Sequence, residues 1–199
     1  PTGGFTHPPE LLDELAHLHG DWWGAAHWWD DAEREASMAA ALALPLFDGL
    51  DDTQRTALRE DPGVLRLALT MWEDDRFAAA ATKHLLERAR PALACVYFQG
   101  VDALSHRSEA HALGDPRFVG IVDEYYEHVD RLLGQLVEAA GPETTVLVVS
   151  DHGWSYGGPY GHYHGPNGVF VLSGAEALAG ELAVAPDVRD VAPTVLALL

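Results

Sequence analysis

The sequence predicts an α/β fold, with a mostly parallel sheet sandwiched by helices and an N-terminal helical cap or insertion. From residue 93 onward, short apolar segments rich in strand-forming residues alternate with helical patterns. One of these segments, 144–150, is continuously apolar in its middle, as is typical of a strand that helices cover on both faces. Glycine and polar residues follow the apolar segments directly, which places candidate ligands at the carboxyl edge of the sheet.

Residues 1–90 are rich in Ala, Leu, Trp and Asp at helical spacing, and we expect them to form the helical cap or insertion. We expect one helix over 10–19 and a second over 30–43. Asp51 and Gln54 resemble the capping box of a third helix. A tryptophan cluster in this part fits helix–helix packing better than the lining of a substrate pocket, and both interpretations stay open: Trp22, Trp23, Trp28 and Trp29.

Residues 91–199 are expected to form the metal-binding α/β core. The apolar run 93–98 predicts a buried strand, in which Cys95 is a small buried residue rather than a reactive thiol. A long amphipathic pattern predicts a helix over about 116–140, which Gly141 ends. The other expected elements are strands over 144–150 and 168–172 and a closing helix over 187–199.

The composition restricts the classes of partner. The chain has 31 acidic and 12 basic residues and a formal net charge of -19, which argues against binding a nucleic acid polymer through a broad basic surface. No apolar run approaches the roughly 18 to 20 residues that a membrane span requires. An anionic substrate would need local positive charge, which bound metal ions can supply. The sequence indicates neither the oligomeric state nor the compartment.

Carboxylates and imidazoles follow two of the expected strands. Asp102 and His106 are four residues apart and share a face if the loop begins a helical turn. Asp151 and His152 are adjacent, and the turn that Gly153 permits lets both side chains reach a metal. Singly, Asp102 also fits a strand-end cap and Asp151 a turn former. Their joint occurrence favours a metal site.

Two further imidazoles, His162 and His164, precede the strand expected over 168–172. By itself, His164 also fits a surface loop residue. Nitrogen and oxygen ligands without thiolate suit zinc, with manganese or iron as competitors. Two such ions roughly 4 Å apart can clamp an ester phosphate, so the pattern indicates hydrolysis.

The segments 96–106, 148–153 and 164–174 resemble the metal-binding half of the alkaline phosphatase superfamily, and most closely its type I phosphodiesterase and nucleotide pyrophosphatase branch. The resemblance covers about residues 93–199 and implies an alkaline phosphatase-like fold. It implies two divalent ions, preferably zinc, and places a ligand at His164 rather than His162. By position, one ion would take Asp102, His106 and His164, and the other Asp151 and His152.

The chain departs from this family at the nucleophile. The family has an early strand ending in Asp, then a Thr, Ser or modified Cys that opens a helix. Thr2 and Thr6 follow no strand, and Thr70 follows an apolar helical run. We therefore expect the nucleophile upstream of Pro1 and expect this piece alone to be inactive or nearly so.

The resemblance implies hydrolysis of a small-molecule phosphate ester, with phosphodiesters first, through a covalent phospho-enzyme. Within the same superfamily the alternatives are a sulfatase, a phosphonate hydrolase or a phosphomutase, because the metal ligands do not define the leaving group. A non-catalytic metal-binding module is a less favoured hypothesis.

Overall fold

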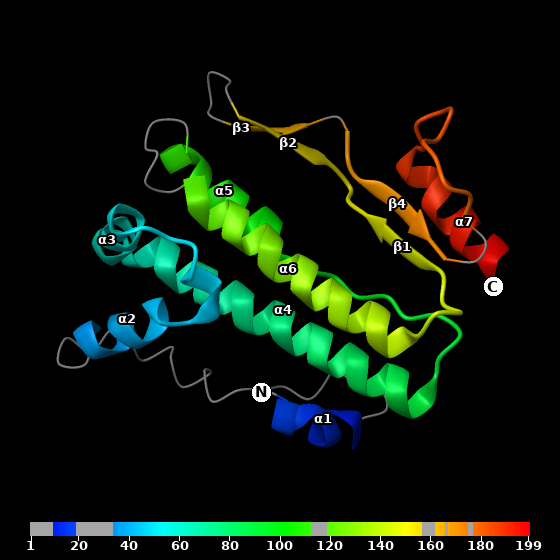
Figure 1. The fold of residues 1–199 in the computed structure, drawn as a ribbon, viewed down its shortest axis with the longest axis horizontal. Helices are drawn as coiled ribbons and strands as arrows, with labels where there is room; N and C mark the ends of the chain where they lie inside the picture. The colour runs from blue at the N-terminus through cyan, green and yellow to red at the C-terminus, as the bar shows by residue number, and fades with distance from the viewer. Residues whose placement is uncertain (1–9, 19–33, 113–118, 157–161, 166, 175–176) are drawn as a thin grey trace.

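The computed structural model describes residues 10–18, 34–112, 119–156, 162–165, 167–174 and 177–199. The α-helices are α1 Glu10–Leu15, α2 Arg34–Leu42, α3 Asp52–Glu60, α4 Pro62–Ala89, α5 Gly100–Ala112, α6 Val119–Ala140 and α7 Val191–Leu198. Short 3₁₀ turns are η1 Ala16–Leu18, η3 Pro45–Phe47 and η5 Val188–Asp190. The strands are β1 Val146–Val149, β2 Gly153–Tyr156, β3 His162–Gly165 and β4 Phe170–Ser173. Helices α1–α6 gather on one side of Figure 1, β1 and β4 lie between them and α7, and β2 and β3 lie along the top of the view.

Local sequence signals define the ends of the helices. The capping box before α3 is confirmed: the Gln54 amide donates to the Asp51 carboxylate over 2.8 Å, and the Asp51 amide donates to the Gln54 side chain over 2.9 Å. At the start of α4, Asp61 accepts from two backbone amides of the first turn. Helix α6 ends at the predicted terminator, Gly141, whose φ of 87° lies in the left-handed region that favours glycine. Most of the described residues before residue 90 are helical, as expected, with short irregular segments between the helices.

The hydrophobic core lies within the helical layer. Helices α4, α5 and α6 pack against one another, and their apolar faces meet those of α2, η3 and α3. The largest buried apolar side chains are Tyr125, Phe47, Leu46, Leu58, Leu65, Leu104 and Ile121. These residues come from both sides of residue 90, so one core spans the boundary that the sequence suggested between 1–90 and 91–199. The division into a cap and a metal-binding core stays a prediction.

The strands do not form the predicted parallel sheet. Strand β1 pairs antiparallel with β4, with Val146 opposite Ser173 and Val149 opposite Phe170. Strand β2 pairs antiparallel with β3. A parallel return needs a crossover connection, usually a helix, whereas the chain between β1 and β4 folds into the β2–β3 pair. The expectation of a mostly parallel sheet is therefore wrong for the part of the chain that the structure describes.

The segment 93–98 is the second correction. It has no regular secondary structure, and Cys95 and most of its neighbours are exposed. An apolar run becomes a strand only when a neighbouring strand pairs with its backbone, and β1 pairs with β4 instead. The predictions of a buried strand here and of a buried Cys95 are therefore wrong.

The remaining elements agree with the sequence more closely. Strands β1 and β4 lie within or beside the predicted segments 144–150 and 168–172, and α7 lies within 187–199. The four tryptophans of residues 22–29 lie outside the described residues, so both interpretations of that cluster stay open. No helix in the described ranges is long and apolar enough to cross a membrane.

Candidate metal centre

Helix α5 presents the first pair of candidate ligands. It begins at Gly100, and the turn expected after residue 100 is thus a full helix. Asp102 and His106 therefore lie one turn apart on the same face. The Oδ1 atom of Asp102 lies 3.6 Å from Nε2 of His106. The four-residue spacing predicted this approach on the condition that a helical turn follows residue 100, and helix α5 meets that condition.

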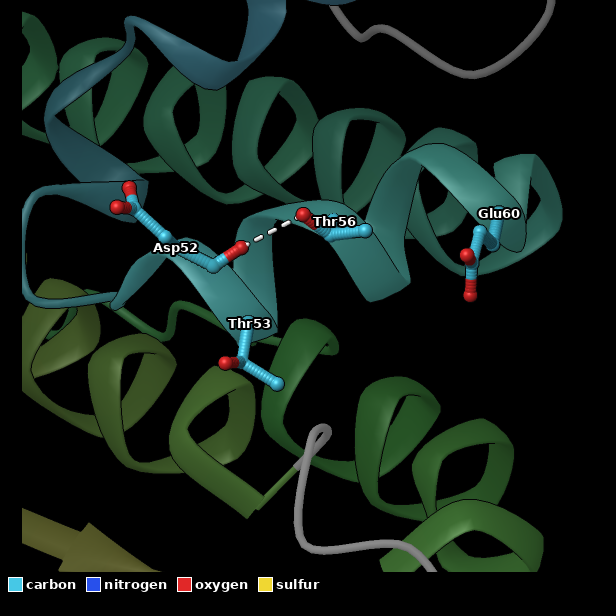
Figure 2. Close-up of a pocket in the computed structure, with 4 residues that line it drawn as sticks. All are labelled: Asp52, Thr53, Thr56 and Glu60. Atoms are coloured by element: carbon cyan, nitrogen blue, oxygen red, sulfur yellow. Dashed lines mark hydrogen bonds between the residues drawn. The ribbon is translucent and has the colours of Figure 1, made fainter.

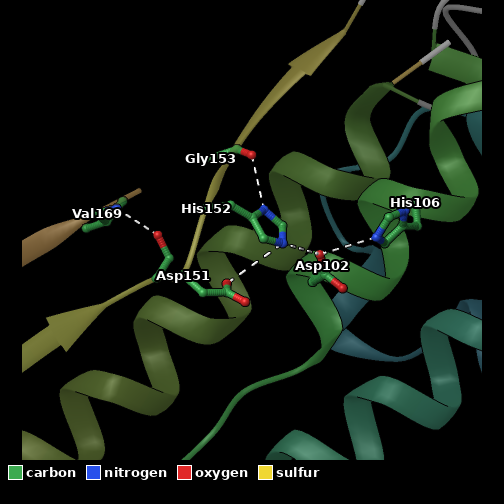
Figure 3. Close-up of polar contacts among 7 residues, drawn as sticks. Asp102, His106, Asp151, His152, Gly153 and Val169 are labelled. Atoms are coloured by element: carbon green, nitrogen blue, oxygen red, sulfur yellow. Dashed lines mark hydrogen bonds and ion pairs between the residues drawn. The ribbon is translucent and has the colours of Figure 1, made fainter. Parts of the chain in front are cut away.

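The loop after β1 presents the second pair. Ser150 extends the β1–β4 pairing, because its amide donates to the Val169 carbonyl over 3.0 Å and its hydroxyl accepts from the Val169 amide over 2.7 Å. The next two residues are therefore held at the end of the strand. Nε2 of His152 lies 3.6 Å from Oδ1 of Asp102 and 3.8 Å from Oδ1 of Asp151 (Figure 3).

The four described candidates form a chain of neighbours rather than a ring. The order is His106, Asp102, His152, Asp151, with Asp102 in contact distance of both imidazoles. Over the ranges that the structure covers, no group of three or more His, Cys, Asp or Glu side chains is arranged to hold one ion. The arrangement therefore brings the predicted carboxylates and imidazoles together without closing a coordination shell.

The rival residues His162 and His164 both lie on β3. The backbone of His164 is opposite Trp154 in the β2–β3 pair, which brings its main chain to the strand that follows His152. The side chains of both histidines lie outside the described part of the structure. The choice of His164 over His162 as a ligand therefore stays a prediction.

The buried oxygen of Asp102 is the clearest sign that the site fits a cation. This Oδ1 atom is buried and has no hydrogen-bond partner among the described residues. Leaving a buried charged acceptor without a partner costs on the order of 1–3 kcal/mol or more. The two imidazole nitrogens at 3.6 Å are beyond hydrogen-bond distance. A cation between these atoms would satisfy the oxygen.

The orientation of the His152 ring is also compatible with a cation at this position. Its Nδ1 atom lies 3.1 Å from the carbonyl oxygen of Gly153. Because a carbonyl only accepts, this contact favours the tautomer with the proton on Nδ1 and leaves the Nε2 lone pair facing the carboxylates of Asp102 and Asp151. The Nε2 lone pair and the two carboxylates repel one another, and a cation placed between the nitrogen and the carboxylate oxygens would remove this repulsion. Metal-binding histidines typically have a backbone or carboxylate partner of this kind.

Trp154, on β2, is a site residue that sequence reasoning missed. Its ring lies edge to face with His106 at a centroid distance of 4.6 Å and with His152 at 5.7 Å. One indole therefore contacts both imidazoles, which come from different elements. The signal in the sequence was an aromatic residue two positions after His152, and the neighbour on α5 was not visible from that position.

Tyr97 is the second residue that sequence reasoning missed. Its side chain is 73% exposed. Partial burial of the hydroxyl raises the pKa of Tyr97, and the charges of Asp102, Asp151 and Asp75 raise it further. The phenol therefore lies within the negative field of the candidate site. Sequence analysis missed Tyr97 because it placed residues 93–98 in a buried strand, away from the candidate site.

Of the three Thr residues considered as nucleophiles, the structure describes only Thr70, and its hydroxyl is bonded within its own helix. The hydroxyl of Thr70 donates to the Arg66 carbonyl within α4 over 2.9 Å, and Thr2 and Thr6 lie outside the described residues. A separate hollow on α3 is lined by Asp52, Thr53, Thr56 and Glu60 (Figure 2). Its lining has no imidazole, and the Thr56 hydroxyl donates to the Asp52 carbonyl. This hollow therefore lacks the ligand types of the centre on α5.

Comparison with known families decides the relationship. Residues 9–157 match the family model described as type I phosphodiesterase / nucleotide pyrophosphatase. The chain belongs to the type I phosphodiesterase / nucleotide pyrophosphatase family. The match includes Asp102, His106, Asp151 and His152 and ends before His164.

The family match also corrects the extent of the sequence resemblance. The motifs placed its beginning near residue 93, whereas the match begins at residue 9 and includes most of the helical region. The helices before residue 90 are therefore part of what makes this chain a type I phosphodiesterase / nucleotide pyrophosphatase family member. Neither the search of curated proteins nor the search of solved structures found a match.

Proposed function

We propose that this family member is a metal-dependent hydrolase of small-molecule phosphate esters that acts first on phosphodiesters. One divalent ion, preferably zinc with manganese or iron as alternatives, would be held by Asp102, His106 and His164. A second would be held by Asp151 and His152. The observation that carries the proposal is the buried Oδ1 atom of Asp102, which has no hydrogen-bond partner among the described residues and lies 3.6 Å from two imidazole nitrogens.

The negative charge of the chain is compatible with an anionic substrate only if cations are bound at the site. The chain has a net charge of -19, and the site itself contains Asp102 and Asp151, so a phosphate ester would be repelled by the protein alone. Bound divalent ions would supply the positive charge that attracts the ester, polarises its phosphoryl oxygens and stabilises the leaving oxygen. The acidic ligands and the anionic substrate are compatible on these terms.

The chain's own residues have positioning roles in this proposal. Asp102 holds its oxygen between the two imidazoles, and the Gly153 carbonyl fixes the tautomer of His152. Trp154 restricts the rotation of both imidazole rings. The nucleophile is proposed to be a Thr or Ser outside residues 1–199, so turnover belongs to the intact protein and this chain alone is expected to be nearly inactive.

The test is hydrolysis by the intact protein. We expect it to hydrolyse a nitrophenyl phosphodiester with zinc or manganese, to lose turnover in EDTA and to recover it when metal is restored. His106→Ala and Asp151→Asn should each reduce turnover by at least about 100-fold, because each removes a ligand. The matched control is Asp123→Asn, an exposed carboxylate on α6, which should leave turnover unchanged.

The outcomes separate the alternatives. Faster turnover of a nitrophenyl sulfate or a phosphonate ester than of the phosphodiester would replace the proposal with a sulfatase or phosphonate hydrolase. Isomerisation of a phosphate ester without release of phosphate would indicate a phosphomutase. Metal binding without turnover of any ester would indicate a non-catalytic module. Near-normal activity of His106→Ala or Asp151→Asn would show that the ligand set is wrong.

A further inference from the structure

A buried carboxylate lies where α4, α5 and α6 meet. Asp75, on α4, is 2% exposed. Its Oδ1 atom accepts from the Gln99 amide over 2.9 Å, and its Oδ2 atom accepts from the Gly100 amide over 3.0 Å. Oδ2 also accepts from the hydroxyl of Tyr125, on α6, over 2.8 Å. Tyr125 is itself fully buried. One side chain therefore joins three helices.

The two amides are those that open α5. Gln99 precedes the helix, and its carbonyl accepts the hydrogen bond from Ala103 that starts the helical ladder. The first amides of a helix have no partner within the helix, and a negative charge there is favourable. Asp75 satisfies two of these amides from a different helix, at a distance of 24 residues or more along the chain.

Gly100 makes the junction tight. A Cβ atom at this position would lie 1.9 Å from the Tyr125 hydroxyl oxygen, so the backbone at the start of α5 packs directly on the hydroxyl that Asp75 accepts from. Any larger residue would push α5 away from α6. Asp102 follows two residues later, so the position of the first turn of α5 determines where its carboxylate lies.

Burying a carboxylate at this junction contributes little to stability, because its charge must be removed from water. Burial raises the pKa of Asp75, which shows that its charged form is penalised, while the hydrogen bonds from Tyr125, Gln99 and Gly100 lower it. Buried charged groups are often replaceable by apolar ones without loss of stability. What an apolar residue would not reproduce is the directional hold on two backbone amides and one hydroxyl.

We propose that Asp75, together with Tyr125, is a positioning residue that fixes the first turn of α5 and so holds Asp102 between His106 and His152. This inference rests on the proposed metal centre, because its consequence is measured as metal affinity. Among the described residues, the hydrogen-bond partners of Asp75 are Gln99, Gly100 and Tyr125, none of which is a proposed ligand. Asp75 acts through the backbone of Gln99 and Gly100.

The test compares metal binding by variants of the full chain. Zinc affinity is measured by competition with a chromophoric chelator, and the d–d absorption of bound cobalt reports the ligand geometry. Asp75→Asn replaces one accepting oxygen with a donor and should weaken zinc binding by at least about tenfold and alter the cobalt spectrum. Tyr125→Phe keeps both backbone bonds and should have a smaller effect of the same kind.

The control is Leu132→Ala, which removes a buried side chain of α6 that takes no part in the junction. It should lower the melting temperature while leaving zinc affinity and the cobalt spectrum at their wild-type values. All variants are compared well below their melting temperatures, so that a loss of affinity does not arise from unfolding. If Asp75→Asn does not fold, Tyr125→Phe carries the test.

Two failures are distinguishable. A wild-type chain that binds neither zinc nor cobalt would overturn the proposed metal centre. A wild-type chain that binds both, with Asp75→Asn and Tyr125→Phe binding equally well and with the same cobalt spectrum, would overturn the positioning role alone. As a readout without metal, the amide protons of Gln99 and Gly100 should shift upfield in Asp75→Asn, because they lose a charged acceptor.

Discussion

At the scale of single residues, the candidate centre depends on side chains that orient other side chains. The Gly153 carbonyl orients the His152 ring, and Trp154 contacts both imidazoles through the edges of their rings. Neither residue supplies a ligand. They reduce the number of orientations that His106 and His152 can adopt, which would raise the affinity of the proposed centre for a cation without adding a bond.

Trp154 allows this to be measured. Each aromatic contact of this geometry is worth about 1 kcal/mol, so Trp154→Ala should weaken metal binding by about five- to thirtyfold. Trp154→Phe keeps an aromatic ring and should retain most of the affinity. Both are measured by titration with zinc at a temperature where the variants are folded. Equal affinity in Trp154→Ala and wild type would show that the indole does not orient the imidazoles.

At the scale of elements, the interface between α4 and α6 is unusual because it buries polar side chains. Asp75 and His128 are both buried there, Asp75 bonded to Tyr125 and His128 beside Trp72. The His128 ring lies 5.6 Å from that of Tyr125 and 6.0 Å from that of Trp72. Burial, together with the positive charges of Arg131 and Arg76, lowers the pKa of His128 to about 4. The packing of these two helices therefore requires a neutral imidazole.

This interface predicts a loss of stability in acid. The pKa of His128 is about 4 when folded and about 6.5 when unfolded, so its contribution is fully present above pH 6.5 and is lost as the pH falls toward 4. The loss should reach about 3 kcal/mol at pH 4. Urea unfolding of wild type and His128→Phe at several pH values measures it.

As the pH falls, the free energy of unfolding should decrease more for wild type than for His128→Phe, because only wild type contains His128. All other titrating groups are present in both proteins, so their effects cancel in the comparison. If the difference in the free energy of unfolding between the two proteins is constant from pH 7 to pH 4, His128 has the same pKa in the folded and unfolded states and the prediction is wrong.

What could be predicted from sequence follows the range of the interactions. The capping box of Asp51 and Gln54, the end of α6 at Gly141 and the approach of Asp102 to His106 depend on residues four or fewer apart. Each was predicted. The pairing of β1 with β4 depends on the path of the chain between them, and periodicity does not record that path. The parallel sheet and the strand over 93–98 were wrong for this reason.

The same limit applies to the site. The proximity of His152 to Asp102 was predicted from two neighbouring strands of a parallel sheet. It is found although residues 93–98 form no strand and β1 pairs antiparallel with β4. The roles of Trp154 and Asp75 were missed because their partners lie on other elements. Nothing in the acidic run 73–75 distinguishes the carboxylate that lies beneath α5 from its exposed neighbour Asp74.

At the scale of the whole molecule, the buried apolar side chains are unevenly distributed. Within the described ranges, all of them lie between Leu15 and Leu136, in the helical layer. The β1–β4 pair contributes none, and Val149 and Val171 are exposed. The candidate centre therefore joins a well-packed helix, α5, to the end of a lightly packed strand, β1.

This distribution predicts two levels of local stability. Amides of α4 and α6 should exchange with solvent only on global unfolding, whereas those of β1 and β4 should exchange at least about tenfold faster, because local opening exposes little apolar surface. Hydrogen exchange of the full chain, followed by mass spectrometry of peptides, measures both. Equal protection of β1 and α4 would show that the strands and helices open as one unit.

The place of Asp102 between two imidazoles has a consequence for how the centre fills. Because His106 and His152 belong to different proposed ions and face the same oxygen, occupancy at one position changes the charge that the other encounters. Linkage requires this influence to be mutual and equal in size. Titration should therefore give a curve that two independent sites of different affinity do not fit, and Asp102→Asn should change the size of the coupling between the two loading steps.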